Sequence, residues 1–349
     1  YHGAMIVGAI VVIGYTVLGG FLAVSTTDLI QSIIMTFALI FIVLFGVQQA
    51  GGLEIIAANA NALPGYLNMT EGFDVVTGQA STYGALSIAS TLAWGLGYFG
   101  MPHILLRFMA IEDDSKLKVS RRIATIWVVF SMFIAIFIGI VGYSVTKAGK
   151  IPLLGTNAEA ETIIIKLSDL LSQYGIFFAI VAGLVLAGIL ASTMSTADSQ
   201  LLAAASSMSH DLIQDFFRVK LSPKAAMTAA RTTVIGIAIV GIFLAWNPNS
   251  SVFNIVSFAW AGFGAAFGPL VLFSLFWKRT NKAGAIAGMI AGGVMVFVWK
   301  YLVAPLGGAW SIYELLPAFL VSCLVIVVVS LATNPPAKEI VEEFEAVGK

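Results

Sequence analysis

The sequence contains few charged residues. Asp, Glu, Lys and Arg together make up 10% of its 349 residues, whereas hydrophobic residues make up 59% and the mean hydropathy is +0.97. A water-soluble domain of this length is not expected to have such a composition. The formal net charge is zero, which gives no indication of a nucleic-acid partner. The composition therefore predicts an all-α protein that crosses a lipid bilayer several times.

Residues that build common reactive centres are also scarce. The single cysteine, Cys323, excludes a disulfide bond within the chain, and three scattered histidines do not indicate a zinc or haem site. Gly95, Gly97 and Gly100 fit the spacing GxGxxG, but no strand precedes them and they lie within a predicted membrane span. The sequence has no nucleophile–base pair and no P-loop. We therefore expect no enzyme, no ATP-driven pump and no cofactor.

Long apolar runs are what the sequence has instead. Segments of about 20 apolar residues predict nine membrane-spanning helices. They cover residues 4–19, 25–48, 84–108, 123–146, 177–207, 226–246, 252–277, 281–303 and 312–333. Residues 49–83 are expected to form an ordered external loop, and the periodicity of residues 158–171 predicts a short surface helix. We expect one transmembrane domain over residues 1–333 and a soluble tail over 334–349.

The lysines and arginines predict the orientation of the chain. If nine helices alternate across the membrane, fourteen of the eighteen basic residues fall on one side. They lie in segments 107–122, 218–231 and 278–282 and in the tail. Because cytoplasmic loops carry an excess of Lys and Arg, this side is predicted to be cytoplasmic. Tyr1 is then outside and the C-terminus inside.

Glycines recur at a spacing of four in two of the predicted spans. One span carries Gly264 and Gly268, and another carries Gly284, Gly288 and Gly292. Small residues at this spacing let helix backbones approach closely in a membrane. The pattern predicts tight helix packing at these positions.

Hydroxyl side chains line one face of the predicted span 177–207. Ser192, Ser195, Thr196 and Ser199 recur at i, i+3, i+4 and i+7, and Asp198 lies beside them. We call these four residues the hydroxyl stripe. Oxygen atoms are the ligands that hard cations prefer, and polar faces in a membrane usually mark an ion path. The alternative is that the hydroxyls bond back to their own helix and help it pack. Four hydroxyls with an acid favour the ion path.

The span 84–108 contains the segment Ala-Trp-Gly-Leu-Gly-Tyr-Phe-Gly-Met-Pro-His at residues 93–103. Its glycines and Pro102 predict an interrupted helix, and transporters bind substrate where spans are broken. Trp94 and Tyr98 are four residues apart, so they share a face and can wall a small ligand. A Pro-kinked packing helix with two core aromatic residues fits this spacing equally well.

An acidic residue, Asp28, lies at the start of the predicted span 25–48. Ser25 and Asp28 have the spacing of a capping box, which is a structural role. An acid that faces a helix bundle can also hold a cation. The two roles are compatible, because a capping residue can also be a ligand.

Several of these segments resemble the sodium:solute symporter family. Residues 15–23, Tyr-Thr-Val-Leu-Gly-Gly-Phe-Leu-Ala, resemble one family signature. Residues 274–278, Ser-Leu-Phe-Trp-Lys, followed by Gly-Ala-Ile-Ala-Gly at 284–288, resemble the other. Segments 94–102, 189–202 and 259–269 are similar to the proline-transporting branch of the family. The resemblance extends over about residues 14–332.

The resemblance implies a fold with an inverted repeat of five plus five helices, of the LeuT-like type, with flanking helices. The resemblance implies an arrangement of 13 helices in a family member, so about four helices are expected to precede Tyr1. The nine spans would then be the last two of the first repeat, all five of the second repeat and two more.

The resemblance also implies site residues. A sodium site of the family matches the carbonyl of Ser192 and the hydroxyls of Ser195 and Thr196. Some members hold a second Na⁺ at positions that match Asp28, Ser195, Asp198 and Ser199. Asp198 stands where several relatives have a hydroxyl or an apolar residue. The number of Na⁺ ions bound, one or two, is therefore left open. The family's proline-binding positions match Trp94, Tyr98 and Pro102. Met101 stands where the pattern often has Gln.

The expected function is Na⁺-coupled symport of L-proline into the cell, with Na⁺ as the coupling ion. The expected location is the bacterial inner membrane, and no protein partner is evident. Another small organic substrate such as pantothenate is the nearest alternative. The membrane domain of a symporter-like sensor is a more distant one, since the tail after the last span is too short for a kinase module.

Overall fold

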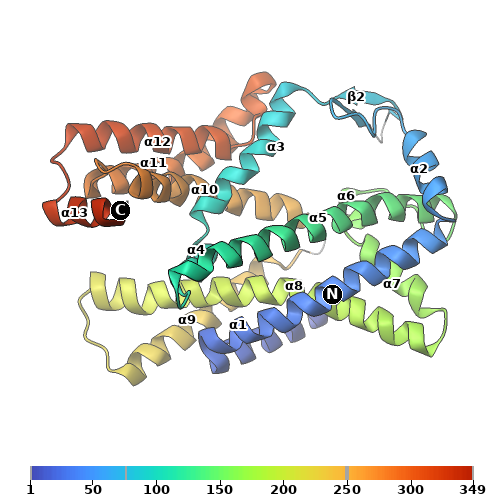
Figure 1. Cartoon of the computed structure of the whole chain (residues 1–349), viewed down its shortest axis with the longest axis horizontal. Coiled ribbons are helices and arrows are strands. Elements are labelled where there is room, and N and C mark those ends of the chain that lie inside the picture. Colours follow the sequence, from blue (N-terminus) through green and yellow to red (C-terminus); the bar gives the residue numbers. More distant parts are fainter. Residues whose placement is uncertain (1, 75–76, 248–250, 348–349) are drawn as a thin grey trace. The chain divides into compact units, whose positions relative to one another are not determined.

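The structure is a computed structural model that describes residues 2–74, 77–247 and 251–347. It is mainly helical, and seven of its described helices are long and apolar enough to cross a membrane. The chain divides into two compact units. Unit 1 comprises Tyr1–Leu63 and Ile111–Ser251, and unit 2 comprises Pro64–Ala110 and Val252–Lys349. Figure 1 shows the order of the elements along the chain.

Unit 1 is built only from helices within the described residues. They are α1 (His2–Gln49), α2 (Leu53–Asn61), η2 (Asp114–Lys116), α5 (Leu117–Lys147), α6 (Asn157–Ala160), α7 (Ile163–Ser172), α8 (Ile176–Ser206), the π-helix η3 (Ser207–Phe216) and α9 (Pro223–Leu244). Its core is formed where α1, α5, α7 and α8 pack together, around fully buried Ile42, Val141 and Leu167.

Helix α1 contains both of the first two predicted spans, with a break between them. Gly20 has φ 61° and ψ −164°, a left-handed conformation that glycine adopts without the steric cost of a Cβ. Tyr15 and Asp28 lie on opposite sides of Gly20, yet both interact electrostatically with Asp198 of α8. On an unbroken helix these two residues would be about 20 Å apart along the axis. The chain therefore changes direction at Gly20, and α1 consists of two arms.

The segment predicted as a short surface helix contains α6 and α7, and α7 has one exposed face, with Ile165, Lys166 and Asp169, and one buried face. Helix α7 begins at Ile163 rather than at residue 158, and its Leu167 and Leu171 are fully buried. The buried face of α7 packs against α1, α5 and α8. The periodicity of the segment alone could not show which partner covers its apolar face.

Unit 2 contains a small hairpin and a group of packed helices. Its elements are β1 (Glu71–Phe73), β2 (Ala80–Thr82), α3 (Ala85–Gly97), η1 (Tyr98–Gly100), α4 (Pro102–Met109), α10 (Val252–Phe276), α11 (Lys282–Val298), η4 (Trp299–Val303), η5 (Ala304–Leu306), η6 (Gly308–Ser311), α12 (Leu315–Ala332) and α13 (Lys338–Val347). The two strands pair antiparallel, with Gly72 opposite Ser81. Helices α10, α11 and α12 lie side by side (Figure 1).

The glycines of α11 form the contact with its neighbours. A Cβ built on Gly284 would collide with Ser330 of α12, and one on Gly288 would collide with Ile326. A Cβ on Gly292 would collide with the carbonyl of Ala265 in α10. The prediction of close packing along this glycine face is thus confirmed. In a membrane, such close approach supplies the van der Waals contact that holds helices together.

Local sequence fixes where two of these helices begin. The Asn281 side chain accepts a hydrogen bond of 2.9 Å from the Gly284 backbone N–H, which caps α11. Its amide also donates to the carbonyl of Asn334, at 2.7 Å, and so ties the start of α11 to the end of α12. Ser222 caps α9 through the N–H of Ala225, and Pro223 occupies the first helical position.

Segments outside the long helices are also ordered. The predicted loop 49–83 contains α2 and the β1–β2 hairpin. The tail contains α13, whose Glu345 forms an ion pair of 3.4 Å with Lys278. The division into a domain over residues 1–333 and a separate tail, the count of nine helices and the inverted repeat remain predictions.

Candidate functional sites

The hydroxyl stripe of α8 gathers oxygen atoms around one backbone carbonyl. The Ser195 hydroxyl donates to the carbonyl oxygen of Ser192 at 3.1 Å, and the Thr196 hydroxyl donates to the same oxygen at 3.4 Å. The three oxygens expected to bind sodium therefore lie within one cluster. A hydroxyl that donates its proton keeps lone pairs for a cation. Oxygen atoms of this kind are the ligands that Na⁺ prefers.

The same hydrogen bonds are the ones expected if the stripe serves packing. The hydroxyls of Ser192 and Ser199 also bond to carbonyls of the preceding turn, those of Ile189 and Ser195, at 2.7 and 2.9 Å. Back-bonding alone therefore does not separate the two interpretations. The residues next to the stripe do, because one of them carries a charge.

Asp198 is 0% exposed and lies within a network on α8 and α1. One carboxylate oxygen accepts a hydrogen bond of 2.7 Å from the hydroxyl of Tyr15, and the other accepts one of 3.3 Å from Ser199. A fully buried carboxylate is costly unless it is hydrogen-bonded or paired with a cation. This acid is thus the strongest indication of an ion site in unit 1.

Asp28 joins this region from the second arm of α1. It is close enough to Asp198 for the two negative charges to repel each other. Such repulsion is relieved when a cation binds between the carboxylates. The four residues expected at a second sodium site, Asp28, Ser195, Asp198 and Ser199, therefore meet in one region of unit 1.

The capping-box interpretation of Ser25 and Asp28 was wrong. The helix restarts directly after Gly20, and the Thr26 hydroxyl already bonds back to the carbonyl of Leu22. Both residues therefore lie inside a formed helix rather than at its first turn. The reason is the left-handed conformation of Gly20, which sets the helix start several residues earlier than the Ser–Asp spacing indicates.

The predicted interruption of the span 84–108 is confirmed. Helix α3 ends at Gly97, residues 98–100 form a 3-10 turn, and Met101 is extended, with φ −82° and ψ 109°. Helix α4 then starts at Pro102, whose missing N–H is not needed at the first helical position. Broken spans of this kind free backbone groups at membrane depth.

An aromatic cluster lies beside this break in unit 2. The Trp94 ring stacks against Phe253, Trp260 and Tyr313, with centroid distances of 5.4, 5.8 and 5.9 Å. Tyr98 meets the Trp260 ring edge-on at 4.8 Å, and its own side chain is 56% exposed. Trp94 and Tyr98 thus belong to one cluster, as their spacing predicted, and Trp260 connects them. Pro102 lies beyond the break.

Glycines at the break allow α3 and η1 to contact α10 directly. A Cβ on Gly97 would collide with the indole of Trp260, and one on Gly100 would collide with the Phe263 carbonyl. The Trp260 indole N–H donates a hydrogen bond of 3.0 Å to the Trp94 carbonyl. The position of Trp260 in the cluster therefore depends on the missing side chain at Gly97.

Replacing Gly97 with alanine is expected to push the Trp260 indole out of its place. Overpacking of this kind costs about 1–3 kcal/mol, and the bond to the Trp94 carbonyl is worth about 1 kcal/mol more. Ligand affinity at the cluster should fall about tenfold, and the melting temperature should fall by a few degrees. Gly95→Ala is the matched control, since a Cβ there meets nothing within 4 Å. Equal behaviour of the two variants would contradict the packing described here.

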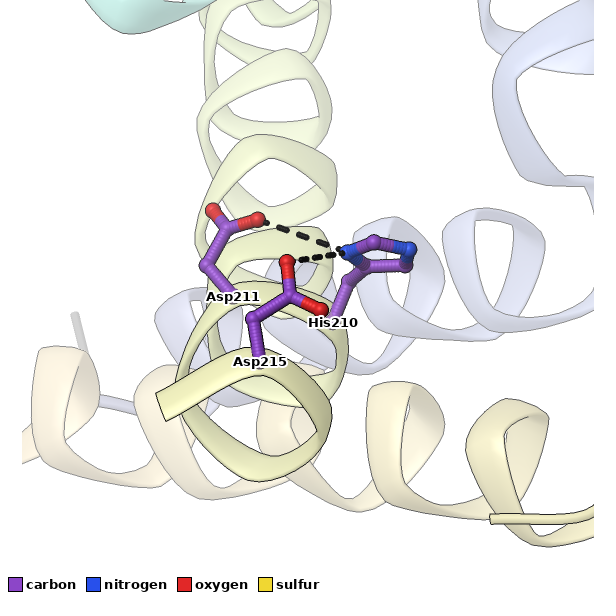
Figure 2. A group of neighbouring side chains, drawn as sticks. All are labelled: His210, Asp211 and Asp215. Carbon is purple, nitrogen blue, oxygen red and sulfur yellow. Dashed lines mark ion pairs between the residues drawn. The ribbon is translucent and has the colours of Figure 1, made fainter. Parts of the chain in front are cut away.

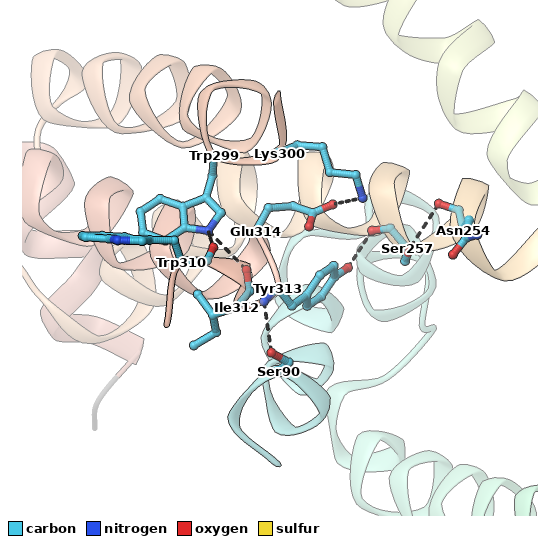
Figure 3. A network of polar contacts seen from close by, with 9 residues as sticks. All are labelled: Ser90, Asn254, Ser257, Trp299, Lys300, Trp310, Ile312, Tyr313 and Glu314. Carbon is cyan, nitrogen blue, oxygen red and sulfur yellow. Dashed lines mark hydrogen bonds and ion pairs between the residues drawn. The ribbon is translucent and has the colours of Figure 1, made fainter. Parts of the chain in front are cut away.

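A polar network holds the Tyr313 side of the cluster (Figure 3). The Tyr313 hydroxyl donates to the carbonyl of Ser257 at 2.6 Å, and its backbone N–H donates to the Ser90 hydroxyl at 3.0 Å. Next to it, Glu314 forms an ion pair of 3.1 Å with Lys300, and the Glu314 side chain is only 6% exposed. These contacts fix the ring of Tyr313 against Trp94.

One further group of titratable residues lies on η3. His210 is 3.6 Å from Asp211 and 3.4 Å from Asp215 (Figure 2), and all three side chains are exposed. Exposed pairs of this kind are solvated and contribute little. Nothing else at this position indicates a ligand.

A mainly helical membrane chain with an oxygen-lined helix and a broken span beside aromatic side chains has the architecture of a secondary transporter. A sequence model of the sodium:solute symporter family matches residues 1–292. The chain belongs to this family, as its motifs indicated.

Curated relatives extend the comparison over the whole chain. It is 39% identical over 345 residues to the high-affinity proline transporter PutP of Bacillus subtilis, covering 99% of this chain and 68% of that protein. It is 40% identical over 352 residues to the sodium/proline symporter of Haemophilus influenzae, covering 100% of this chain and 67% of that protein. The chain thus spans about two thirds of the length of these relatives.

A solved structure of a Na⁺-coupled sialic acid symporter, in a substrate-bound outward-open state, has the same fold. The TM-score is 0.73 at 17% identity, over 97% of this chain and 68% of the other. At this identity the likeness concerns the fold alone.

Four aromatic residues at these sites were not identified from the sequence. Phe253, Trp260 and Tyr313 contact Trp94 from positions more than 150 residues away, so no local spacing connects them. Trp260 lies in the segment 259–269 that resembles the family, which was the available signal. Tyr15 begins the segment 15–23, but its partner Asp198 lies 183 residues away along the chain.

Proposed function

We propose that the protein is a secondary active transporter that couples the entry of Na⁺ to the uptake of L-proline by alternating access. The observation that carries this proposal is the break at Met101 beside an aromatic cluster, in a chain that also carries the hydroxyl stripe. The names of relatives at 39–40% identity, proline transporter and sodium/proline symporter, support both the ion and the solute.

Proline suits the chemistry of the cluster. Its ring is small and apolar and can pack against Trp94 and Tyr98, while its carboxylate and its amine need polar partners. The start of α4 at Pro102 offers the positive end of a helix to the carboxylate. Trp94, Tyr98 and Pro102 are therefore the proposed substrate residues.

Sodium is proposed to bind as a transported substrate at α8. The carbonyl of Ser192 and the hydroxyls of Ser195 and Thr196 form the proposed main site. Asp28, Ser195, Asp198 and Ser199 form the proposed second site. Here the two carboxylates supply charge and the serines supply neutral oxygen.

The proposed location is the bacterial inner membrane, with the C-terminus in the cytoplasm. The support is the segregation of fourteen of the eighteen basic residues to one side under the expected helix count.

Uptake of radiolabelled proline into proteoliposomes tests the function. An inward Na⁺ gradient should drive accumulation above equilibrium, whereas an equal K⁺ gradient should not. Counterflow with a panel of unlabelled solutes, including pantothenate, then identifies the substrate. Proline must be the strongest competitor, and counterflow with pantothenate but not with proline would overturn the assignment.

Replacing Asp28 with asparagine tests the second sodium site. Because Asp28 lies inside the helix and does not cap it, the asparagine side chain should leave the stability of the protein nearly unchanged. The lost charge should raise the apparent Na⁺ constant about tenfold, which corresponds to about 1.4 kcal/mol. Na⁺ activation of proline uptake measures this effect. Asp169→Asn, an exposed acid on α7, is the control. An unchanged Na⁺ constant in the Asp28 variant would remove this residue from the site.

A further inference from the structure

Tyr15 contacts the proposed second sodium site without belonging to it. Its hydroxyl donates a hydrogen bond of 2.7 Å to one carboxylate oxygen of Asp198 and also lies 3.4 Å from the carbonyl of Met194. Both acceptors are on α8, one turn apart. The tyrosine therefore fixes the first arm of α1 against the α8 segment that carries the hydroxyl stripe.

The Tyr15 bond determines how the Asp198 carboxylate is oriented. The other carboxylate oxygen lies 3.3 Å from the Ser199 hydroxyl, whose single proton is shared between this oxygen and the Ser195 carbonyl at 2.9 Å. With one oxygen held by Tyr15 and the other by its own helix, the carboxylate plane has little freedom. Ligands held in place before an ion arrives lose less entropy when it binds.

A neutral donor is the appropriate partner for a carboxylate that must bind a cation. A Lys or Arg in this place would compensate the charge of Asp198 and compete with Na⁺. The phenol hydroxyl satisfies part of the buried carboxylate but leaves its charge in place. Its oxygen also keeps lone pairs.

The break at Gly20 brings this tyrosine to the acid pair. Tyr15 comes from the first arm of α1 and Asp28 from the second, and both interact with Asp198. The site therefore depends on three segments, two of which are joined by a single left-handed residue.

We propose that Tyr15 is a positioning residue that holds Asp198 in the orientation required for the second Na⁺. This inference rests on the proposed Na⁺ coupling. It assigns to Tyr15 a role in ion affinity, distinct from a tether that only holds the two helices together.

A double-mutant cycle tests the proposal. Binding of ²²Na⁺ to the purified protein is measured for the wild type, Tyr15→Phe, Asp198→Ser and the double variant. Tyr15→Phe should weaken the second class of Na⁺ binding about tenfold, because a hydrogen bond to a charged group is lost. In the Asp198→Ser background the same substitution should change the Na⁺ constant less than twofold, because the carboxylate it positions is gone.

Tyr174→Phe is the matched control, since Tyr174 precedes α8 and its hydroxyl donates a bond of 2.7 Å to Gln49 at the end of α1, far from the hydroxyl stripe. It should leave Na⁺ binding unchanged. Equal effects of Tyr15→Phe with and without Asp198 would overturn the proposal, as would a lower melting temperature with unchanged Na⁺ binding. A single class of Na⁺ sites in the wild type would also overturn it.

Failure of the proposed function is a separate result. It would appear as wild-type protein that binds Na⁺ but does not accumulate proline, and the ²²Na⁺ cycle still tests Tyr15 in that case. Conversely, Tyr15→Phe protein could bind ²²Na⁺ with the same isotherm as the wild type while Na⁺-driven proline uptake is intact. This result would refute only the role of Tyr15.

Discussion

Replacing Trp94 with alanine is expected to raise the apparent proline constant by one to two orders of magnitude. The ring stacks on three other aromatic side chains, so its loss removes the centre of the proposed substrate wall. Apolar burial contributes roughly 25 cal/mol per Å², and a proline ring against such a wall gains about 2 kcal/mol. Tyr98→Ala should have a similar effect through its contact with Trp260.

Proline binding across a Na⁺ titration measures this effect. The substitution leaves the hydroxyl stripe intact, so Na⁺ binding without proline should change little. Saturating Na⁺ should not restore proline affinity, because an ion cannot replace the lost ring. Trp246→Ala, which removes an indole stacked on His2 in unit 1, is the control. Full rescue by excess Na⁺ would show that the aromatic residues act through the ion site.

Removing either hydroxyl at the proposed main sodium site should weaken Na⁺ activation strongly. Ser195→Ala and Thr196→Ala each delete an oxygen that lies within hydrogen-bond reach of the Ser192 carbonyl. The apparent Na⁺ constant should rise about tenfold or more, which corresponds to about 1.4 kcal/mol.

Ser206→Ala is the control for these two variants. It removes a hydroxyl from the last turn of the same helix, beyond the stripe. The Na⁺ dependence of proline uptake should separate the three variants, while their amounts in the membrane stay alike. If Ser195, Thr196 and Ser206 variants share one Na⁺ constant, the stripe serves packing only.

The features predicted correctly from the sequence are local ones. The interruption at Met101 follows from three glycines and a proline within eight residues, and the glycine face of α11 follows from a spacing of four. Each depends on the conformational or steric properties of the residues themselves. The hydroxyl stripe likewise needs only the period of a helix.

The features that the sequence did not predict depend on tertiary contacts. The helices that cover the apolar face of α7 could not be named in advance, and the partners of Trp94 come from α10 and the segment before α12. The start of the second arm of α1 depends on Gly20, where Ser25 and Asp28 indicated a later start. Spacing along the chain carries no information about which distant segment supplies a partner.

The glycine face of α11 has a consequence for how this protein can vary through evolution. Gly284, Gly288 and Gly292 leave no space for a methyl group, so substitutions there should be destabilising and rarely retained. The opposite face exposes a row of large apolar side chains: Ile286, Ile290, Val294 and Phe297. Lipid accepts many such side chains equally well. One helix therefore combines positions that are nearly fixed with positions free to drift among apolar residues, and substitution rates along it should alternate with the helical period.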